Sequence, residues 1–172
     1  GQLLPVNHYA RKNIGYLYTT MSSSNAILDT DDDNFPKDPY YTFPSFSEKF
    51  KSLTSTTNRL NIYKYFTSKH IWPRGMGFPL PDNKYQVGNA NFKIGAWQGL
   101  ADIEPDVDAI YRLAGLSNVV FEQKDPVCIS LNTWCPFNSQ NTLWPKSNLI
   151  LCYIPSTVTF RFCDILRSYV AQ

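Results

Sequence analysis

Acidic side chains gather between Asp29 and Asn34, where four aspartates fall within five positions. The stretch directly follows a short apolar run, Ala26 to Leu28. Carboxylate oxygens are preferred ligands of Mg²⁺ and Mn²⁺, and a cation that keeps open coordination positions can share a bound diphosphate. An apolar strand that ends in spaced carboxylates therefore predicts a metal-dependent enzyme that acts on a nucleotide-linked substrate.

Three other interpretations of the acidic stretch compete with a cation site. A solvated loop is the commonest fate of such a run, and this interpretation stays open. A calcium loop of the helix-loop-helix kind requires Gly at its sixth position and Glu at its twelfth, where this chain has Asn34 and Tyr40. An aspartyl-phosphate site also begins with spaced aspartates, but no lysine motif in a suitable context accompanies them. We therefore set the last two interpretations aside.

The composition is that of one packed domain over residues 1–172. An aromatic content of 15% and a charged content of only 17% argue against a disordered tail. The net charge of +2 comes without a basic stripe, so we expect no nucleic acid partner. The longest apolar run near the C-terminus, residues 149–154, is too short to cross a bilayer. Because the chain starts at Gly1 and shows no secretory signal, we expect it to be cut or incomplete.

The four cysteines, Cys128, Cys135, Cys152 and Cys163, do not form a CxxC pair, so a structural zinc site is not expected. Cys152 and Cys163 lie among apolar residues and are predicted to be buried in the core. A disulfide between Cys128 and Cys135 stays open. The two histidines lack the spacing of metal ligands, and His70 is predicted to be packed or exposed.

Helices and strands must position these groups. Ile14, Leu17, Tyr18 and Met21 recur at helical spacing, so residues 10–23 are predicted to form an amphipathic helix with these side chains on its buried face. The further predicted elements are strands at 26–29, 60–66, 94–100, 119–122 and 148–154, irregular segments at 34–47 and 72–81, and a C-terminal helix at 159–171. The apolar face of that last helix is predicted to comprise Phe162, Ile165, Leu166, Tyr169 and Val170. This alternation predicts an α/β or mixed fold.

The residues also resemble a known family. The run Arg11-Lys12-Asn13-Ile14-Gly15, followed by an apolar strand and an aspartate cluster, resembles the nucleotide-sugar half of GT-A glycosyltransferases. Over nearly its whole length the chain is similar to the STELLO-like family of glycosyltransferases. The matching stretches are RKNIGYLY (11–18), DTDDDN (29–34), WPRG (72–75), WQGLADIEPDVDAIYRL (97–113), PFNSQNT (136–142) and FRFCDILRSYVAQ (160–172).

The resemblance implies a GT-A-like nucleotide-diphospho-sugar transferase fold that lacks part of its N-terminal nucleotide-binding unit. It implies transfer of a sugar from a nucleoside-diphosphate sugar, most simply a UDP-sugar, to a glycan or other hydroxyl acceptor, with Mn²⁺ or Mg²⁺ as cofactor. Partner proteins of glycan synthesis are also implied. The implied location is the Golgi lumen for a eukaryotic protein anchored outside this chain, and otherwise the cytoplasm.

Site residues follow from the same resemblance. Asp33 is the expected direct metal ligand, and Asp31 is expected to contact the ribose or the water shell of the metal. Arg11, Lys12 and Asn13 are the expected cofactor-binding residues. For Arg11 and Lys12, two interpretations stay open: contact with the diphosphate or with a carboxylate, and a solvated first helical turn.

Asp164 is the expected general base, a role that requires hydrogen-bond reach of the acceptor hydroxyl. Arg161 and Arg167 are the expected charge partners that keep Asp164 ionised, and the competing interpretation is a carboxylate that stabilises a helix start. Asp106 and Asp108 are expected at the acceptor, or else in the first turn of a helix that begins near Pro105. Trp97, Asn138 and Gln140 could supply a stacking face and amide hydrogen bonds to a sugar.

Two rival functions remain. One is a catalytically inactive relative that serves as a binding or assembly partner of glycan-synthesising enzymes. The retention of Asp31, Asp33 and Asp164 together argues against it, because a degenerate site would have lost at least one of them. The other is a cation- or carbohydrate-binding module without transfer chemistry, which would bind its ligand without a nucleotide.

Overall fold

The computed structural model describes residues 5–37, 44–81, 84–115 and 118–172. The chain forms two compact units. Unit 1 comprises Gly1–Asn34, Gly95–Gly99 and Phe137–Gln172, and unit 2 comprises Phe35–Ile94 and Leu100–Pro136. The acidic stretch and the C-terminal helix both belong to unit 1. That residues 1–172 act as one catalytic domain stays a prediction.

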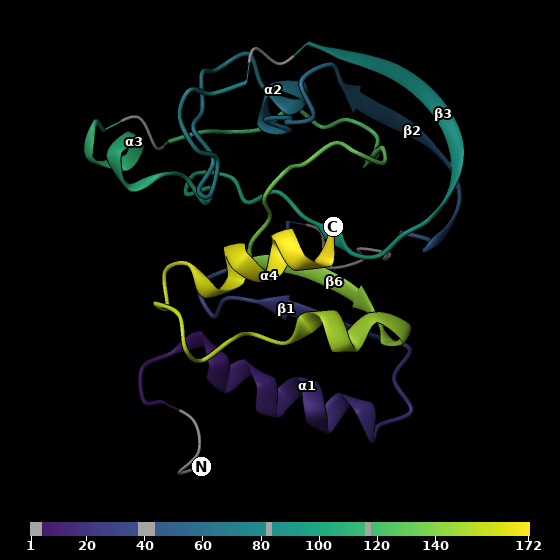
Figure 1. The fold of residues 1–172 in the computed structure, drawn as a ribbon, viewed down its shortest axis with the longest axis vertical. Coiled ribbons are helices and arrows are strands. Elements are labelled where there is room, and N and C mark those ends of the chain that lie inside the picture. Colours follow the sequence, from purple (N-terminus) through teal and green to yellow (C-terminus); the bar gives the residue numbers. More distant parts are fainter. Residues whose placement is uncertain (1–4, 38–43, 82–83, 116–117) are drawn as a thin grey trace. The chain divides into compact units, whose positions relative to one another are not determined.

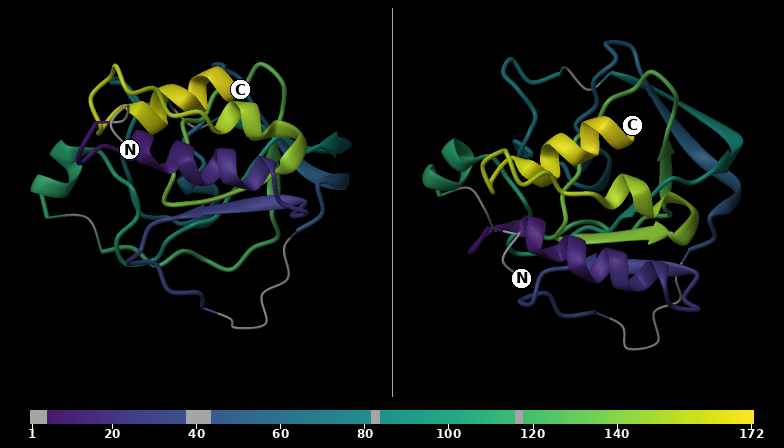
Figure 2. Two further views of the ribbon diagram at one scale, coloured as in Figure 1. Left: turned by 90° about the horizontal axis from the view of Figure 1, so that it is seen from below. Right: turned by 60° about the horizontal axis from the view of Figure 1, so that its bottom comes forward.

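Unit 1 is a small antiparallel sheet with helices (Figure 1). Its elements are η1 (Tyr9–Arg11), α1 (Lys12–Thr20), β1 (Ala26–Thr30), β4 (Trp97–Gln98), β6 (Asn141–Pro145), η2 (Lys146–Cys152) and α4 (Cys163–Ala171). The strand order is β1-β6-β4, and Asp29 lies opposite Thr142 in the register. Figure 2 shows α1 and α4 on the same side of β1 and β6. The core of this unit comprises Ala10, Tyr16, Trp144, Leu149, Cys152, Ile154 and Cys163.

Unit 2 contains a second sheet, of order β3-β2-β5. Its elements are β2 (Ser47–Ser55), α2 (Tyr63–Phe66), β3 (Tyr85–Lys93), α3 (Ala109–Leu113) and β5 (Val127–Ile129). β2 pairs antiparallel with β3 and parallel with β5. A core cluster of this unit comprises Phe66, Ile71, Val107, Tyr111, Val119 and Phe121. The two small sheets and their helices confirm the prediction of an α/β or mixed fold.

Several predicted elements are confirmed. A helix lies within 10–23, a strand covers 26–29, and a helix ends the chain, although α4 begins at Cys163 and not at 159. The segment 72–81 is irregular as predicted, whereas residues 38–43 of the predicted loop 34–47 lie outside the described residues. All four cysteines are buried and free, which confirms core positions for Cys152 and Cys163 and leaves Cys128 and Cys135 unbridged.

Other element predictions are wrong. Residues 60–66 contain a turn and the short helix α2, because the carbonyl of Asn61 accepts a hydrogen bond from the Lys64 amide (3.2 Å). Residues 148–154 are mostly in η2, where Leu149 and Cys152 are buried three residues apart, as a 3₁₀ helix requires. The strand expected at 94–100 is confined to β4. The strand expected at 119–122 is reduced to a bridge from Val119 to Ile103.

The apolar stripe of α1 faces outward, contrary to the prediction. Ile14, Leu17, Tyr18 and Met21 are exposed, with fractions that range from 49% to 79%. The buried side chain of α1 is that of Tyr16. The helix therefore turns its polar side to the sheet.

α4 shows a similar inversion. Phe162 and Val170, two members of its predicted apolar face, are exposed, whereas Asp164, Arg167 and Ser168 are buried together with Ile165. A helix normally buries its apolar stripe. Here the polar groups of α1, α4 and β1 meet in one internal network, and their mutual hydrogen bonds offset the cost of burying them.

These burial patterns predict unequal costs for two matched truncations. Ile165→Ala, at a side chain that is 1% exposed, is expected to lower the free energy of unfolding by about 2–5 kcal/mol because it leaves a cavity. Leu17→Ala, at 67% exposure, is expected to change it by less than about 0.5 kcal/mol. Urea unfolding measures both values. A cost for Leu17→Ala as large as that for Ile165→Ala would contradict the outward orientation of the α1 stripe.

Candidate functional site

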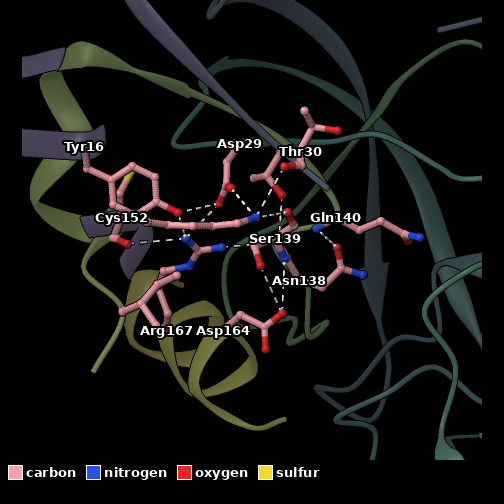
Figure 3. A network of polar contacts seen from close by, with 12 residues as sticks. Tyr16, Asp29, Thr30, Asn138, Ser139, Gln140, Cys152, Asp164 and Arg167 are labelled. Atoms are coloured by element: carbon pink, nitrogen blue, oxygen red, sulfur yellow. Dashed lines mark hydrogen bonds and ion pairs between the residues drawn. The ribbon is translucent and has the colours of Figure 1, made fainter. Parts of the chain in front are cut away.

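Asp29 lies at the centre of the polar network (Figure 3). It is only 5% exposed, and its two oxygens bind groups from two helices. Oδ2 accepts hydrogen bonds from the Tyr16 hydroxyl of α1 (2.6 Å) and from Nη1 of Arg167 of α4 (3.2 Å). Oδ1 accepts from Nζ of Lys12 (2.9 Å), at the start of α1. One strand residue thus ties both helices to β1.

Lys12 extends the network to the acidic stretch. Its Nζ also donates to Oδ1 of Asp31 (3.1 Å) and to the carbonyl oxygens of Thr30 (3.4 Å) and Ser139 (3.2 Å). Burial lowers the pKa of Lys12, but the Asp29 and Asp31 carboxylates outweigh burial and raise it above its ordinary value. The ammonium group therefore carries its charge throughout the neutral range.

Arg167 and Tyr16 hold the other side of Asp29. Burial lowers the pKa of Arg167, but Tyr16 and Asp29 more than offset this effect, so its pKa is raised. Burial and the Asp29 charge raise the pKa of Tyr16, so its hydroxyl stays protonated and donates to Asp29. The guanidinium group also donates to the carbonyls of Cys152 (3.3 Å) and Asn138 (3.4 Å). Arg167 therefore links four parts of unit 1.

The acidic stretch is anchored where β1 ends. The amide of Asp31 donates to the carbonyl of Gln140 (3.1 Å), and the side-chain amide of Asn34 donates to the same oxygen. The backbone amide of Asn34 donates to the carbonyl of Asp31 (3.3 Å) and closes a turn. Asp32 and Asp33 are exposed on this turn. The stretch is therefore more than a loosely solvated loop.

The pKa of the Asp31 carboxyl is shifted by its surroundings. Burial raises its pKa, and the charges of Asp29 and Asp33 raise it further, while Lys12 acts in the opposite direction; the net shift is upward. The fold therefore holds Asp31 in an environment that opposes its negative charge. A divalent cation would relieve this opposition, because it favours the ionised form.

The acidic turn offers few protein ligands for a metal ion. Among the described residues, no group of three His, Cys, Asp or Glu side chains is placed to hold a metal ion. Asp31 and Asp33 offer two carboxylates, and Mg²⁺ is commonly bound by one or two carboxylates together with substrate phosphates and water. That these two aspartates bind Mg²⁺ or Mn²⁺ stays a prediction.

Asp164 lies in the first turn of α4 and is 1% exposed. Its Oδ2 accepts from the amide (3.3 Å) and the hydroxyl (3.4 Å) of Ser139, and its Oδ1 accepts from the amide of Ile165 (3.0 Å). Arg167, one of its expected charge partners, pairs with Asp29. Asp164 thus fixes the Ser139 segment, whose carbonyl binds Lys12. Its role as a base stays a prediction.

The other two expected cofactor-binding residues differ in their surroundings. The side chain of Asn13 donates to the carbonyl of Ile154 (2.8 Å) and accepts from its amide (2.9 Å), so both of its polar groups join α1 to the segment after η2. Arg11 is exposed and lines an open hollow of about 270 Å³ together with Tyr9 and Phe160. Arg11 is therefore accessible to an anionic ligand, whereas Asn13 serves the fold.

Three of the five expected acceptor residues belong to unit 1. Trp97, in β4, is half-buried and lies opposite Leu143 of β6. Oδ1 of Asn138 accepts from the amide of Gln140 (2.9 Å), and its carbonyl accepts from the hydroxyl of Thr142 (2.7 Å). Asn138 is thus buried in the turn before β6. In Figure 3 the Gln140 side chain points away from the Asp29 network.

The other two expected acceptor residues belong to unit 2. Both oxygens of Asp106 accept from Nε of Arg74 (2.8 Å each). Asp108 is the N-cap of α3 and accepts from the amide of Ile110 (2.9 Å). The interpretation of Asp108 as part of a helix start is therefore confirmed, and acceptor roles for the pair stay predictions.

Tyr16 and Ser139 were not among the predicted site residues. Tyr16 follows Lys12 by four residues, so both side chains lie on one face of α1. This spacing was a usable signal, but the apolar stripe on the other face is the stronger pattern. No comparable local signal marks Ser139, because its partners Lys12 and Asp164 are distant in the sequence.

Comparison with known proteins shows which class of protein this chain is similar to. No family model matches the chain. It is similar to proteins described as probable glycosyltransferases, at 24% identity over 98% of its length. Two of them are the probable glycosyltransferases STELLO1 and STELLO2 of Arabidopsis thaliana. These matches confirm the resemblance to STELLO-like proteins that the motifs predicted.

The matched part is limited in the relatives. The chain spans about a quarter of the length of the curated relatives it matches, 25% in each case. Within the part of the chain that the structure describes, no helix is long and apolar enough to span a membrane.

The network predicts that Asp29 contributes strongly to the stability of the fold. Asp29→Asn keeps the shape but leaves Arg167, whose side chain is 1% exposed, without its charged partner. Loss of one partner of a buried ion pair costs about 3–5 kcal/mol. Chemical denaturation of the variant measures this cost. Asp32→Asn, at an exposed neighbour, is the control and is expected to change stability by less than about 0.5 kcal/mol. Equal stability of both variants would show that the network does not carry the fold.

The ionised form of Asp31, unlike that of Asp29, is expected to lower the stability of the fold. Its raised pKa means that the folded protein keeps the proton at a pH where the unfolded chain has lost it. Stability from this group is therefore fully present below about pH 4, the unfolded pKa, and is lost as the pH rises through the folded pKa. Thermal unfolding of wild type and Asp31→Asn between pH 3 and 7 should show wild type losing stability relative to the variant. A stability of wild type relative to Asp31→Asn that stays constant, or that increases, as the pH rises would contradict this sign.

Proposed function

We propose that this protein is a glycosyltransferase domain of GT-A-like fold that moves a sugar from a nucleoside-diphosphate sugar, most simply a UDP-sugar, to a glycan or other hydroxyl acceptor. The observation that carries the proposal is the placement of Asp31. It lies at the end of a strand, where burial and the neighbouring carboxylates raise its pKa, on a turn anchored to the Gln140 carbonyl. The similarity to proteins named probable glycosyltransferases supports the same conclusion.

Asp31 and Asp33 are the residues that would hold Mg²⁺ or Mn²⁺ in this proposal. When bound, the cation neutralises charge on the leaving diphosphate as a Lewis acid. Lys12 orients Asp31 through its Oδ1. Arg11, exposed at the rim of the hollow, is placed to meet an anionic group of the donor. Of these two cationic side chains, Lys12 is the one in contact with the acidic turn.

Asp164, the proposed base, can act only if the acceptor hydroxyl reaches its carboxylate. A general base must come within hydrogen-bond reach of the hydroxyl that it deprotonates. At 1% exposure, and with Oδ2 on Ser139, Asp164 meets an acceptor only after the Ser139 segment moves. Its contacts in the present state make it a positioning residue for that segment.

One specific observation favours a second candidate, a catalytically inactive relative that binds other proteins of glycan synthesis. Lys12, Asn13 and Asp164 all bind groups of the protein itself. Such a relative would keep the fold and bind no nucleotide. A location in the Golgi lumen, for a protein anchored outside this chain, belongs to either proposal.

A thermal-shift titration with UDP and Mn²⁺ tests the proposed function. Ligand at about 100 times its dissociation constant stabilises by about 2.7 kcal/mol, which corresponds to a rise in Tm of roughly 5–10 °C at this size. The rise should require both UDP and Mn²⁺. It should vanish in Asp33→Ala and persist in Asp32→Ala, a matched change on the same exposed turn.

The alternatives give different results. No rise with UDP and Mn²⁺ together would refute nucleotide binding by this chain alone. The same titration on a longer chain would then separate the inactive relative, which still gives no rise, from a site that upstream residues complete. A rise with Mn²⁺ or a glycan that is indifferent to UDP would favour a binding module without transfer chemistry.

A further inference from the structure

The ammonium group of Lys12 lies among four oxygen atoms. Two belong to the carboxylates of Asp29 (2.9 Å) and Asp31 (3.1 Å), and two are the backbone carbonyl oxygens of Thr30 (3.4 Å) and Ser139 (3.2 Å). Four acceptors exceed the three protons of an ammonium group. Carboxylate and carbonyl oxygens that converge on one positive centre are also the usual ligand set of a hard metal cation. The Lys12 ammonium group therefore occupies a position that a metal cation could also occupy. We call the four oxygens, from Asp29, Asp31, Thr30 and Ser139, the oxygen cage.

The cage is rigidly built. Asp29 is held by Tyr16 and Arg167, and the Ser139 segment is held by Asp164. The Lys12 backbone begins α1, whose next residue, Asn13, is fixed by two hydrogen bonds to Ile154. The Lys12 side chain is 24% exposed, and the centroid of the Tyr9 ring lies 5.4 Å from its Nζ.

The charges of the four residues Lys12, Arg167, Asp29 and Asp31 cancel. Lys12 and Arg167 carry two positive charges, and Asp29 and Asp31 carry two negative charges. A divalent cation that approaches Asp31 would therefore meet an ammonium group already bound to one oxygen of the same carboxylate. Within the acidic stretch, the exposed Asp32 and Asp33 are then the residues that attract the divalent cation. A diphosphate would change the balance, because its oxygens can accept from Lys12 and bind the cation at the same time.

We propose that Lys12 is a built-in competitor of the divalent cation for Asp31, so that the protein binds the cation tightly only together with a diphosphate. This inference rests on the proposed function, because it concerns the same cation site. Lys12 is in this sense a positioning residue: it holds Asp31 in place and sets the order in which ligands bind. The free protein would bind little Mn²⁺ or Mg²⁺ without nucleotide.

The test compares Lys12→Met, which removes the charge and keeps an unbranched side chain, with Lys12→Arg, which keeps the charge. Mn²⁺ alone is titrated into each folded protein and followed by isothermal titration calorimetry, and circular dichroism confirms the fold. Wild type and Lys12→Arg are expected to bind Mn²⁺ weakly. Lys12→Met is expected to bind it at least about tenfold more tightly without nucleotide, a change of about 1.4 kcal/mol. Lys12→Gln replaces Lys12→Met if the latter does not fold.

A second set of variants tests whether the additional Mn²⁺ affinity of Lys12→Met arises at Asp31. Adding Asp31→Asn to Lys12→Met should abolish the gain, because the proposal places the competition at Asp31. A gain that survives this change, or no gain in either neutral variant, would overturn the inference.

The same samples separate this inference from the proposed function. If wild type responds to UDP with Mn²⁺ while neutral variants gain no Mn²⁺ affinity, the proposed function stands and the role of Lys12 is wrong. If neutral variants gain Mn²⁺ affinity through Asp31 but no sample responds to UDP, the competition at Asp31 is supported and nucleotide binding fails.

Discussion

The buried contact between Asp29 and Arg167 is the constraint on which unit 1 depends. Both side chains are almost fully removed from water, and neither could stay there without the other. Tyr16 and Lys12 complete the shell of Asp29, so β1, α1 and α4 are fixed by polar groups at the point where they meet. The apolar core around Trp144 and Ile154 packs within the same unit. The ion pair adds a directional constraint, because hydrogen bonds have preferred angles.

This arrangement also explains how folding and chemistry share residues. Asp29 belongs to the acidic stretch by sequence, yet it is buried and serves the fold. Asp31, two residues later, projects on the same side of the strand and shares Lys12 with it, but lies where the strand ends and solvent begins. A pattern of alternate aspartates thus places one carboxylate inside and one at the surface. The first holds the second in place through a common ammonium group.

The sequence predicted some of this and missed the rest for identifiable reasons. The aspartate stretch, its strand and the two flanking helices depend on local patterns, and these were recognisable. The outward stripe of α1 and the buried polar face of α4 were not, because periodicity alone does not say which face of a helix meets the core. In unit 2, local alternation in residues 60–66 suggested a strand, whereas the Asn61 turn favours a helix. Ser139 could be found only in three dimensions, since its partners Lys12 and Asp164 are far away along the chain.

The position of Trp144 has an optical consequence. Its indole is fully buried, and the Arg167 guanidinium lies 5.3 Å from its ring centroid. An indole in such dry surroundings emits at shorter wavelength than one in water, and a nearby cation shifts its excited state. The other tryptophans, Trp72, Trp97 and Trp134, are all at least partly exposed. The intrinsic fluorescence of this chain therefore carries a component that reports directly on the charge network, without any added label.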